Sequence, residues 1–272
     1  MKTILMLTNF SETSRKAIIS YLKVHSEIKT DSKIGLLNVY STPKTGQSQL
    51  LNLDDILEQY SLQDLKREKQ EIDKFPELGN LDIDLISGKG DLIKVIDQLD
   101  AKRPIDLIVL GSKGSNILKQ LVLGSNTDRI VRLSKTPVLV IPEGVDFKKP
   151  KKIVFATDLK ECRFKKHFER LANIIRFFGA ELLILNIYKE TNPDGQLFEE
   201  LMNIHLKDIP HSFHYVKNND PAKGISNFLE ENQANMLALI ERPGNLLVKL
   251  FRHSVSNQMA LSAEMPLLVF HS

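Results

Sequence analysis

The chain has 272 residues, of which 42% are hydrophobic and 26% charged, and its net charge is +3. This length and composition predict a good hydrophobic core, divided between two domains. Acidic and basic residues are interspersed without a basic stripe, and there is no signal peptide or apolar run of about 18 residues, so we expect no nucleic-acid or membrane partner. A single cysteine, Cys162, suits a reducing compartment, and we expect a cytoplasmic protein.

Strands and helices are predicted to alternate through the first half of the chain. The pattern of apolar residues predicts strands near residues 3–8, 33–39, 82–87, 105–110 and 137–141, and helices near 12–29, 52–73, 91–102 and 125–134. This alternation requires crossover connections, which put helices on both faces of a mostly parallel, doubly wound sheet. Five strands in flavodoxin-like order are favoured. Ligands of such sheets bind beyond the carboxyl ends of the strands, where the strand order reverses.

The second half of the chain repeats the first. Residues 36–40 (LLNVY) recur as 184–188 (ILNIY), and residues 136–140 (TPVLV) recur as 265–269 (MPLLV). The repeat is too long for a solenoid, so each half should be a whole domain, with the boundary near residues 142–150.

The two copies differ in length. Asn38 and Asn186 are 148 positions apart, whereas Pro137 and Pro266 are 129 apart, so the second copy is shorter by 19 residues. The loss falls mostly between its second and third strands, and we expect the counterpart of the 52–73 helix to be missing. Whether this removes a lid over a pocket or trims a surface helix stays open.

Three glycines follow the predicted strand at residues 105–110. Gly111 and Gly114 let the backbone approach a ligand closely, and Gly124 opens the next helix. The unpaired amides at the start of a helix, with its dipole, favour an anion, and Ser125 and Thr127 add hydroxyl donors beside them. The arrangement suits a phosphate.

The spacing of Gly, two residues, Gly, nine residues, Gly and then Ser resembles the signature of the universal stress protein family, and residues 4–11 resemble its first strand and turn. The resemblance implies a HUP-type nucleotide-binding fold, flavodoxin-like or Rossmann-like, and a site for ATP or AMP, with or without magnesium. The residues that it places around the nucleotide are Asn9, Val39, Gly111, Lys113, Gly114, Gly124, Ser125, Asn126 and Thr127.

The second copy has lost the glycines. Alignment on the final strand puts Ile240, Pro243 and His253 at the positions of the three glycines, and only hydroxyls remain, as Ser254 and Ser256. A histidine Cβ and ring would stand where a phosphate approaches, and proline lacks an amide donor. We therefore expect domains at 1–143, with the intact glycine loop, and at 150–272, degenerate. An anion other than a nucleotide, attracted by Arg242, Arg252 and His253, is the open alternative for the second copy.

The first copy also departs from the family. It has Asn9 where the family usually has an aspartate, and the second copy keeps Asp158. A neutral hydrogen-bond acceptor contributes less than a charged one, so nucleotide binding and magnesium retention should be weaker.

No catalytic or metal-binding set is predicted. The P-loop spacing and the nucleophile elbow are both absent, so we expect at most weak ATP hydrolysis. The leading hypothesis is an ATP- or AMP-binding regulatory or stress-response protein, with the nucleotide in the first domain. A ligand-free structural or interaction module and a very slow ATPase stay open as alternatives.

The final strands of the two copies are expected to meet. Residues 138–141 and 267–270 are apolar enough to pair within one chain, giving a pseudo-dimer, a pseudo-twofold sandwich of two five-stranded sheets. Whether two chains then form a homodimer, and which protein partner binds, is left open.

Overall fold

A computed structural model describes residues 1–28, 30–41, 51–79, 81–112, 125–159, 165–191, 194–241 and 265–271. The first half contains, in chain order, β1 (Thr3–Leu7), α1 (Glu12–Glu27), β2 (Lys33–Tyr40), α2 (Leu51–Asp73), β3 (Ile83–Lys89), α3 (Leu92–Lys102), β4 (Leu107–Ser112), α4 (Ser125–Leu133) and β5 (Val138–Pro142). Every element predicted for this half is present, with ends that agree within two residues.

The described part of the second half follows the same order. It contains β6 (Lys152–Ala156), α5 (Lys165–Phe178), β7 (Glu181–Tyr188), α6 (Gln196–His205), β8 (His211–Lys217), α7 (Pro221–Glu231), β9 (Met236–Glu241) and β10 (Leu267–His271).

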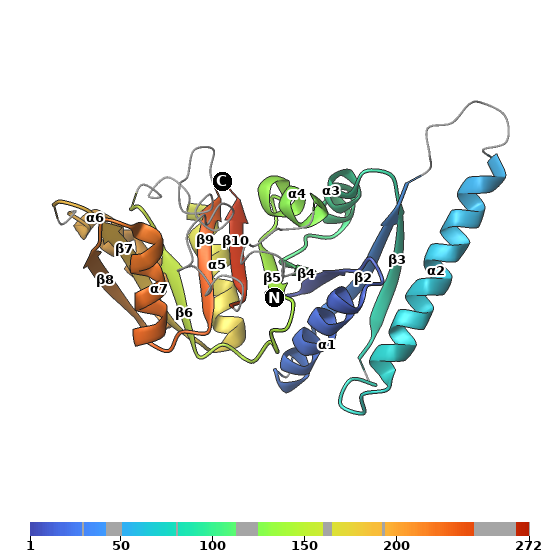
Figure 1. Ribbon diagram of the computed structural model, residues 1–272, viewed down its shortest axis with the longest axis horizontal. Helices are drawn as coiled ribbons and strands as arrows, with labels where there is room; N and C mark the ends of the chain where they lie inside the picture. The colour runs from blue at the N-terminus through green and yellow to red at the C-terminus, as the bar shows by residue number, and fades with distance from the viewer. Residues whose placement is uncertain are drawn as a thin grey trace.

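The strands form one ten-stranded sheet in the order β3-β2-β1-β4-β5-β10-β9-β6-β7-β8 (Figure 1). Among the described strands, neighbours are parallel within each half, and β5 and β10 are the one antiparallel pair. Counted from its own first strand, each half has the order 3-2-1-4-5. This confirms the doubly wound α/β class. The order itself is the Rossmann one, which corrects the flavodoxin-like order. The first strand lies between the second and the fourth, whereas the flavodoxin-like order puts it between the second and the third.

The halves are joined edge to edge through β5 and β10. Leu139 lies opposite Leu268, and this pair is flanked by Val138 opposite Val269 and by Val140 opposite Leu267. The expected pairing of these two strands within the chain is present, but the sandwich of two stacked sheets is wrong. Stacking would require a helix-free face on each sheet, and here helices pack on both faces.

The hydrophobic core on one face of the sheet is continuous across both halves. It lies beneath α1, α2, α5 and α6 and includes the fully buried side chains of Ile18, Leu65 and Ile175. The opposite face has one core beneath α3 and α4 and a separate one beneath α7. Burial of apolar surface stabilises a fold by on the order of 25 cal/mol per Å², so these cores hold the sheet and the strand ends at its edges in place.

An aromatic cluster packs the two halves together beside the β5–β10 junction. Tyr21 on α1 stacks on Phe147 of the connecting segment, with ring centroids 6.0 Å apart, and Phe147 meets Phe178 on α5 edge-on at 6.1 Å. His25 lies 6.1 Å from Phe177 and is 4% exposed, and neither of its ring nitrogens has a hydrogen-bond partner. Burial therefore lowers the pKa of His25, because the cluster cannot solvate an imidazolium.

The helix expected to be missing from the second half is shortened instead. α6 has 10 residues, against 23 in α2, and it connects β7 to its parallel neighbour β8. Parallel neighbours need a crossover, and the sheet face still has to be covered, which the buried side chains of Phe198 and Met202 do. The second half is therefore shorter mostly in this crossover, whose helix is reduced but kept. None of the helices in the described part of the chain is long and apolar enough to cross a bilayer.

Candidate functional site

The turn after β1 has the same unusual conformation as the turn after β6. Phe10 and Leu159 both have a φ of 63°, the left-handed region that a bulky side chain rarely occupies. Each is held by the threonine two residues earlier, because the Thr8 hydroxyl accepts from the Phe10 amide at 2.9 Å and the Thr157 hydroxyl accepts from the Leu159 amide at 3.0 Å. Strain of about 1–3 kcal/mol is kept at both positions, as is common at binding sites.

Asn9 lies at the tip of the first of these turns, with its side chain exposed. Its Oδ1 accepts from the Ser11 amide at 3.1 Å, and the Ser11 hydroxyl in turn caps α1 by accepting from the Ser14 amide at 3.2 Å. One lone pair of Oδ1 is therefore committed to the turn, which leaves the second lone pair and the two Nδ2 donors for a ligand. At the matching place in the second half, Asp158 is half-buried.

The main chain of Val39 faces the end of β1. The Leu37 carbonyl accepts from the Thr8 amide on the β1 side, whereas the Tyr40 carbonyl accepts from the Gly90 amide on the β3 side. Main-chain groups of successive residues point to opposite neighbours, so those of Val39 point toward β1. The last β1 residue in register is Leu7, opposite Leu37, so the strand has already ended there.

Gly111 is required first for packing. It lies near the end of β4, where a Cβ would come within 2.9 Å of the Thr13 carbonyl oxygen and 3.0 Å of the Ala17 Cβ on α1. The glycine therefore lets the first turns of α1 lie directly against β4. Ser112, the next residue, is 1% exposed and its Oγ has no hydrogen-bond partner. Sequence reasoning passed over Ser112, and its only sequence signal was its place between two glycines.

The remaining glycine-loop residues of the prediction, Lys113, Gly114 and Gly124, lie outside the described residues. Ser125 begins α4, Asn126 is exposed and Thr127 is half-buried. The first turns of α4 are tied to α3 by an ion pair of 2.6 Å between Arg129 and Asp91. Asp91 also caps α3, and the Arg129 hydrogen bond is the main reason why the pKa of its carboxyl is lowered.

The structure thus brings Asn9, Val39 and Gly111 to one edge of the sheet. This edge is the switch point of the first half, because the chain runs from β1 outward to β2 and β3 and then returns on the other side of β1 as β4. The positions that replace the glycines in the second half fall outside the described residues, apart from Ile240 in β9. Among the described residues, no group of three or more His, Cys, Asp or Glu could hold a metal ion.

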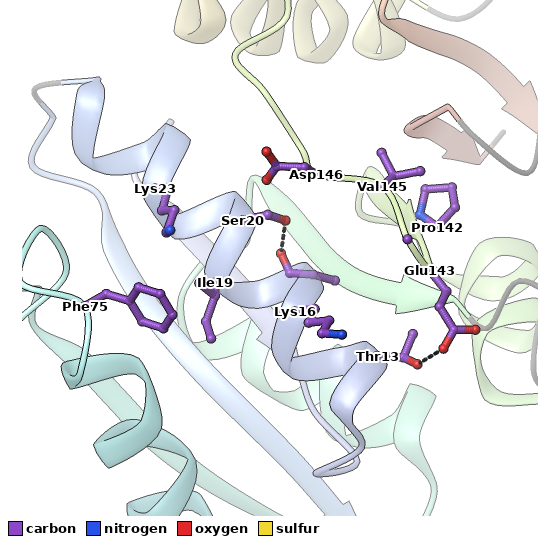
Figure 2. Close-up of a pocket in the computed structure, with 12 residues that line it drawn as sticks. Thr13, Lys16, Ile19, Ser20, Lys23, Phe75, Pro142, Glu143, Val145 and Asp146 are labelled. Atoms are coloured by element: carbon purple, nitrogen blue, oxygen red, sulfur yellow. Dashed lines mark hydrogen bonds between the residues drawn. The ribbon is translucent and has the colours of Figure 1, made fainter.

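A groove of about 350 Å³ lies elsewhere, between α1, Phe75 and the segment after β5 (Figure 2). Thr13 closes one end by donating to Glu143 at 2.8 Å. Two lysines line the α1 wall, and both have acidic partners, Lys16 with Glu12 at 2.7 Å and Lys23 with Glu77 at 3.5 Å. None of the predicted nucleotide-contacting residues lines this groove.

These features define a class of protein: a tandem repeat of a doubly wound α/β domain, with a strained turn after the first strand of each repeat. Residues 1–142 match the universal stress protein family, and the chain belongs to that family. A universal stress protein from Methanocaldococcus jannaschii is 26% identical over 154 residues, which cover 52% of this chain and 94% of that protein. The chain is therefore the tandem form, about twice the length of that relative.

Solved structures extend the likeness to both halves. A universal stress protein from Archaeoglobus fulgidus aligns with 99% of this chain and 98% of its own, at 21% identity and a TM-score of 0.71. A protein of unknown function from Pseudomonas aeruginosa aligns with 100% of this chain and 92% of its own, at 17% identity and a TM-score of 0.55. At these identities the comparison shows a shared fold.

Proposed function

We propose that the first half, residues 1–143, binds an adenine nucleotide at the carboxyl edge of β1, β2 and β4, and that the protein is a nucleotide-binding regulatory protein of the stress response. The observation that carries the proposal is the convergence of the Asn9 turn, the Val39 main chain and Gly111 on the switch point. This convergence occurs in the half whose sequence keeps the family's glycine spacing.

Each group has a role that suits a nucleotide. The main chain of Val39 supplies the donor and acceptor pair that an adenine edge requires, and Asn9 supplies polar groups for the nucleoside. Lys113, Gly114, Gly124 and the start of α4 at Ser125, Asn126 and Thr127 surround ribose and phosphates, where helix-terminal amides favour an anion. Because Asn9 is neutral, we propose ATP or AMP held with weak dependence on magnesium.

The second half, residues 150–272, then serves as a degenerate copy that completes the sheet. The symmetric register of β5 and β10 about Leu139 and Leu268 supports an arrangement like that of a dimer within one chain. In this proposal the nucleotide is a bound signal, and turnover by ATP hydrolysis is slow.

Isothermal titration of nucleotide-free protein with ATP and with AMP tests the proposal. We expect binding of one nucleotide per chain, lost in Gly124→Asp, which puts a carboxylate where the phosphates are proposed to lie. The matched control is His253→Asp, which introduces the same residue at the corresponding position of the second half and should bind normally. If neither nucleotide binds below millimolar concentration, the proposal fails, and the β5–β10 junction would then favour a ligand-free structural module.

A further inference from the structure

Two polar side chains of α2 are buried against the sheet. Ser61 is 5% exposed and Glu68 is 1% exposed, although both lie on a helix that otherwise buries apolar residues such as Leu65 and Ile72. A buried carboxylate without partners would be very costly, so its contacts carry information about what α2 is fixed to. We call Ser61, Glu68 and the groups that they contact the polar seat of α2.

The carboxylate of Glu68 connects α2 to both sides of the Asn9 turn. Its Oε2 accepts from Nε and Nη2 of Arg15 on α1, both at 2.8 Å. Its Oε1 lies 3.3 Å from the Thr8 hydroxyl, which donates to it. The same Thr8 hydroxyl accepts from the Phe10 amide, so the strained turn and α2 share one hydroxyl group.

Ser61 reaches the same residue by a second route. Its hydroxyl donates to Asn38 Oδ1 at 2.9 Å and accepts from the Ser87 hydroxyl at 2.8 Å. Asn38 in turn donates through Nδ2 to the Thr8 carbonyl at 2.9 Å. Both routes from α2 therefore end on Thr8, the residue immediately before Asn9.

Among the described residues, the second half keeps the base of this network, but α6 buries Phe198 and Met202 where α2 has its polar seat. Asn186 donates to the Thr157 carbonyl at 2.9 Å, as Asn38 does to Thr8, but its Oδ1 is buried without a hydrogen-bond partner. Tyr215, which stands opposite Asn186 in the register as Ser87 stands opposite Asn38, donates instead to Glu199 on α6 at 2.6 Å. The polar seat thus belongs to the half with the intact glycine spacing.

We infer that Glu68 and Ser61 are positioning residues for the nucleotide site, and that ligand binding at the Asn9 turn is coupled to the seating of α2. This inference rests on the proposed function of the same edge. Because Thr8 is shared, loosening α2 frees the turn to leave its strained conformation. By linkage, a ligand that holds the turn must hold α2 to the same extent.

The experiment compares the full-length wild-type protein with Glu68→Gln, which keeps the side-chain shape but removes the charge that Arg15 pairs with. Amide hydrogen exchange is followed in residues 8–15 and 51–73, with and without ATP, and the ATP dissociation constant is measured by titration. The matched control is Glu71→Gln, because Glu71 lies on the same helix, with its side chain 40% exposed and paired with Lys74. Ser61→Ala is the milder second variant.

In the wild type and the control, ATP should slow exchange in residues 51–73, although none of the proposed contact residues lies there. In Glu68→Gln, exchange should rise in both segments, ATP should no longer protect α2, and the dissociation constant should rise about tenfold. Ser61→Ala should move the same readouts by less. Faster exchange of α2 alone, with unchanged ATP affinity, would mean a merely structural seat and would overturn the inference.

The failure of the proposed function is distinguishable from this result. If the wild type binds no ATP or AMP, the proposed function fails, and the exchange arm without nucleotide still decides the positioning role. Faster exchange in both residues 8–15 and residues 51–73 of Glu68→Gln would then support the positioning role for another ligand. Unchanged exchange in residues 8–15 would overturn that role.

Discussion

Replacing Gly111 by alanine should destabilise the protein independently of any ligand. The added Cβ would lie 2.9 Å from the carbonyl oxygen of Thr13, a main-chain atom within the first turn of α1, and 3.0 Å from the Ala17 Cβ. Neither neighbour is the end of a flexible side chain, so α1 as a whole must shift. Overpacking of this kind costs about 1–3 kcal/mol, and we expect about 2 kcal/mol.

Urea unfolding measures this loss. With a slope of about 3 kcal/mol per molar urea, a loss of about 2 kcal/mol lowers the midpoint by roughly 0.7 M. Gly79→Ala is the matched control, because the nearest atom to its added Cβ, the Pro76 carbonyl oxygen, is an ordinary 3.9 Å away. Equal midpoints for the two variants would refute the packing role and leave approach of a ligand as the reason for a glycine at position 111.

Three further predictions concern the aromatic cluster between the halves, the Asn9 turn and the β5–β10 junction. Burial lowers the pKa of His25, so the unfolded state takes up a proton at a higher pH than the folded state does, and the stability that neutral His25 contributes is lost as the pH falls below the unfolded pKa of about 6.5. In His25→Phe, the urea midpoint should therefore decline less between pH 7 and pH 5 than in the wild type. An unchanged decline would contradict this. Asn9→Asp should bind magnesium–ATP about fivefold more tightly by titration, since a charged acceptor contributes about 1 kcal/mol more than a neutral one, and equal or weaker affinity would count against Asn9 as a ligand residue. Leu268→Ala should cost about 2–5 kcal/mol in urea unfolding, because the side chain is fully buried opposite Leu139; the half-buried Leu267→Ala should cost less, and the reverse order would contradict the junction.

Local patterns predicted the elements and the repeat. Each helix and strand of the first half was placed within two residues, because apolar periodicity acts over a few positions. The structure shows that Ser11 and Asp91 cap α1 and α3 at the predicted helix starts. The strands expected to pair, at 138–141 and 267–270, do so in antiparallel register. The shortened α6 was misjudged because an alignment counts residues, whereas a crossover and a covered sheet face require some helix whatever its length.

The candidate site was predictable only in outline. Asn9, Val39 and Gly111 were named from a family resemblance, and the structure brings them to one edge. Glu68 had no signal, because an acid on a helix rich in charged residues is normally solvated, and only docking of α2 on Arg15 and Thr8 makes it a buried ion pair.

By itself, the sequence determined the tandem doubly wound class, the order of the elements and the half that keeps the glycine spacing. These depend on periodicity and spacing along the chain, which are visible without coordinates. Only the tertiary structure decided that the halves share one sheet edge to edge, that Gly111 makes room for α1, and that α2 is seated on Thr8. Each of these depends on distances between segments far apart in the sequence, where packing and desolvation select among arrangements that local propensity leaves equally open.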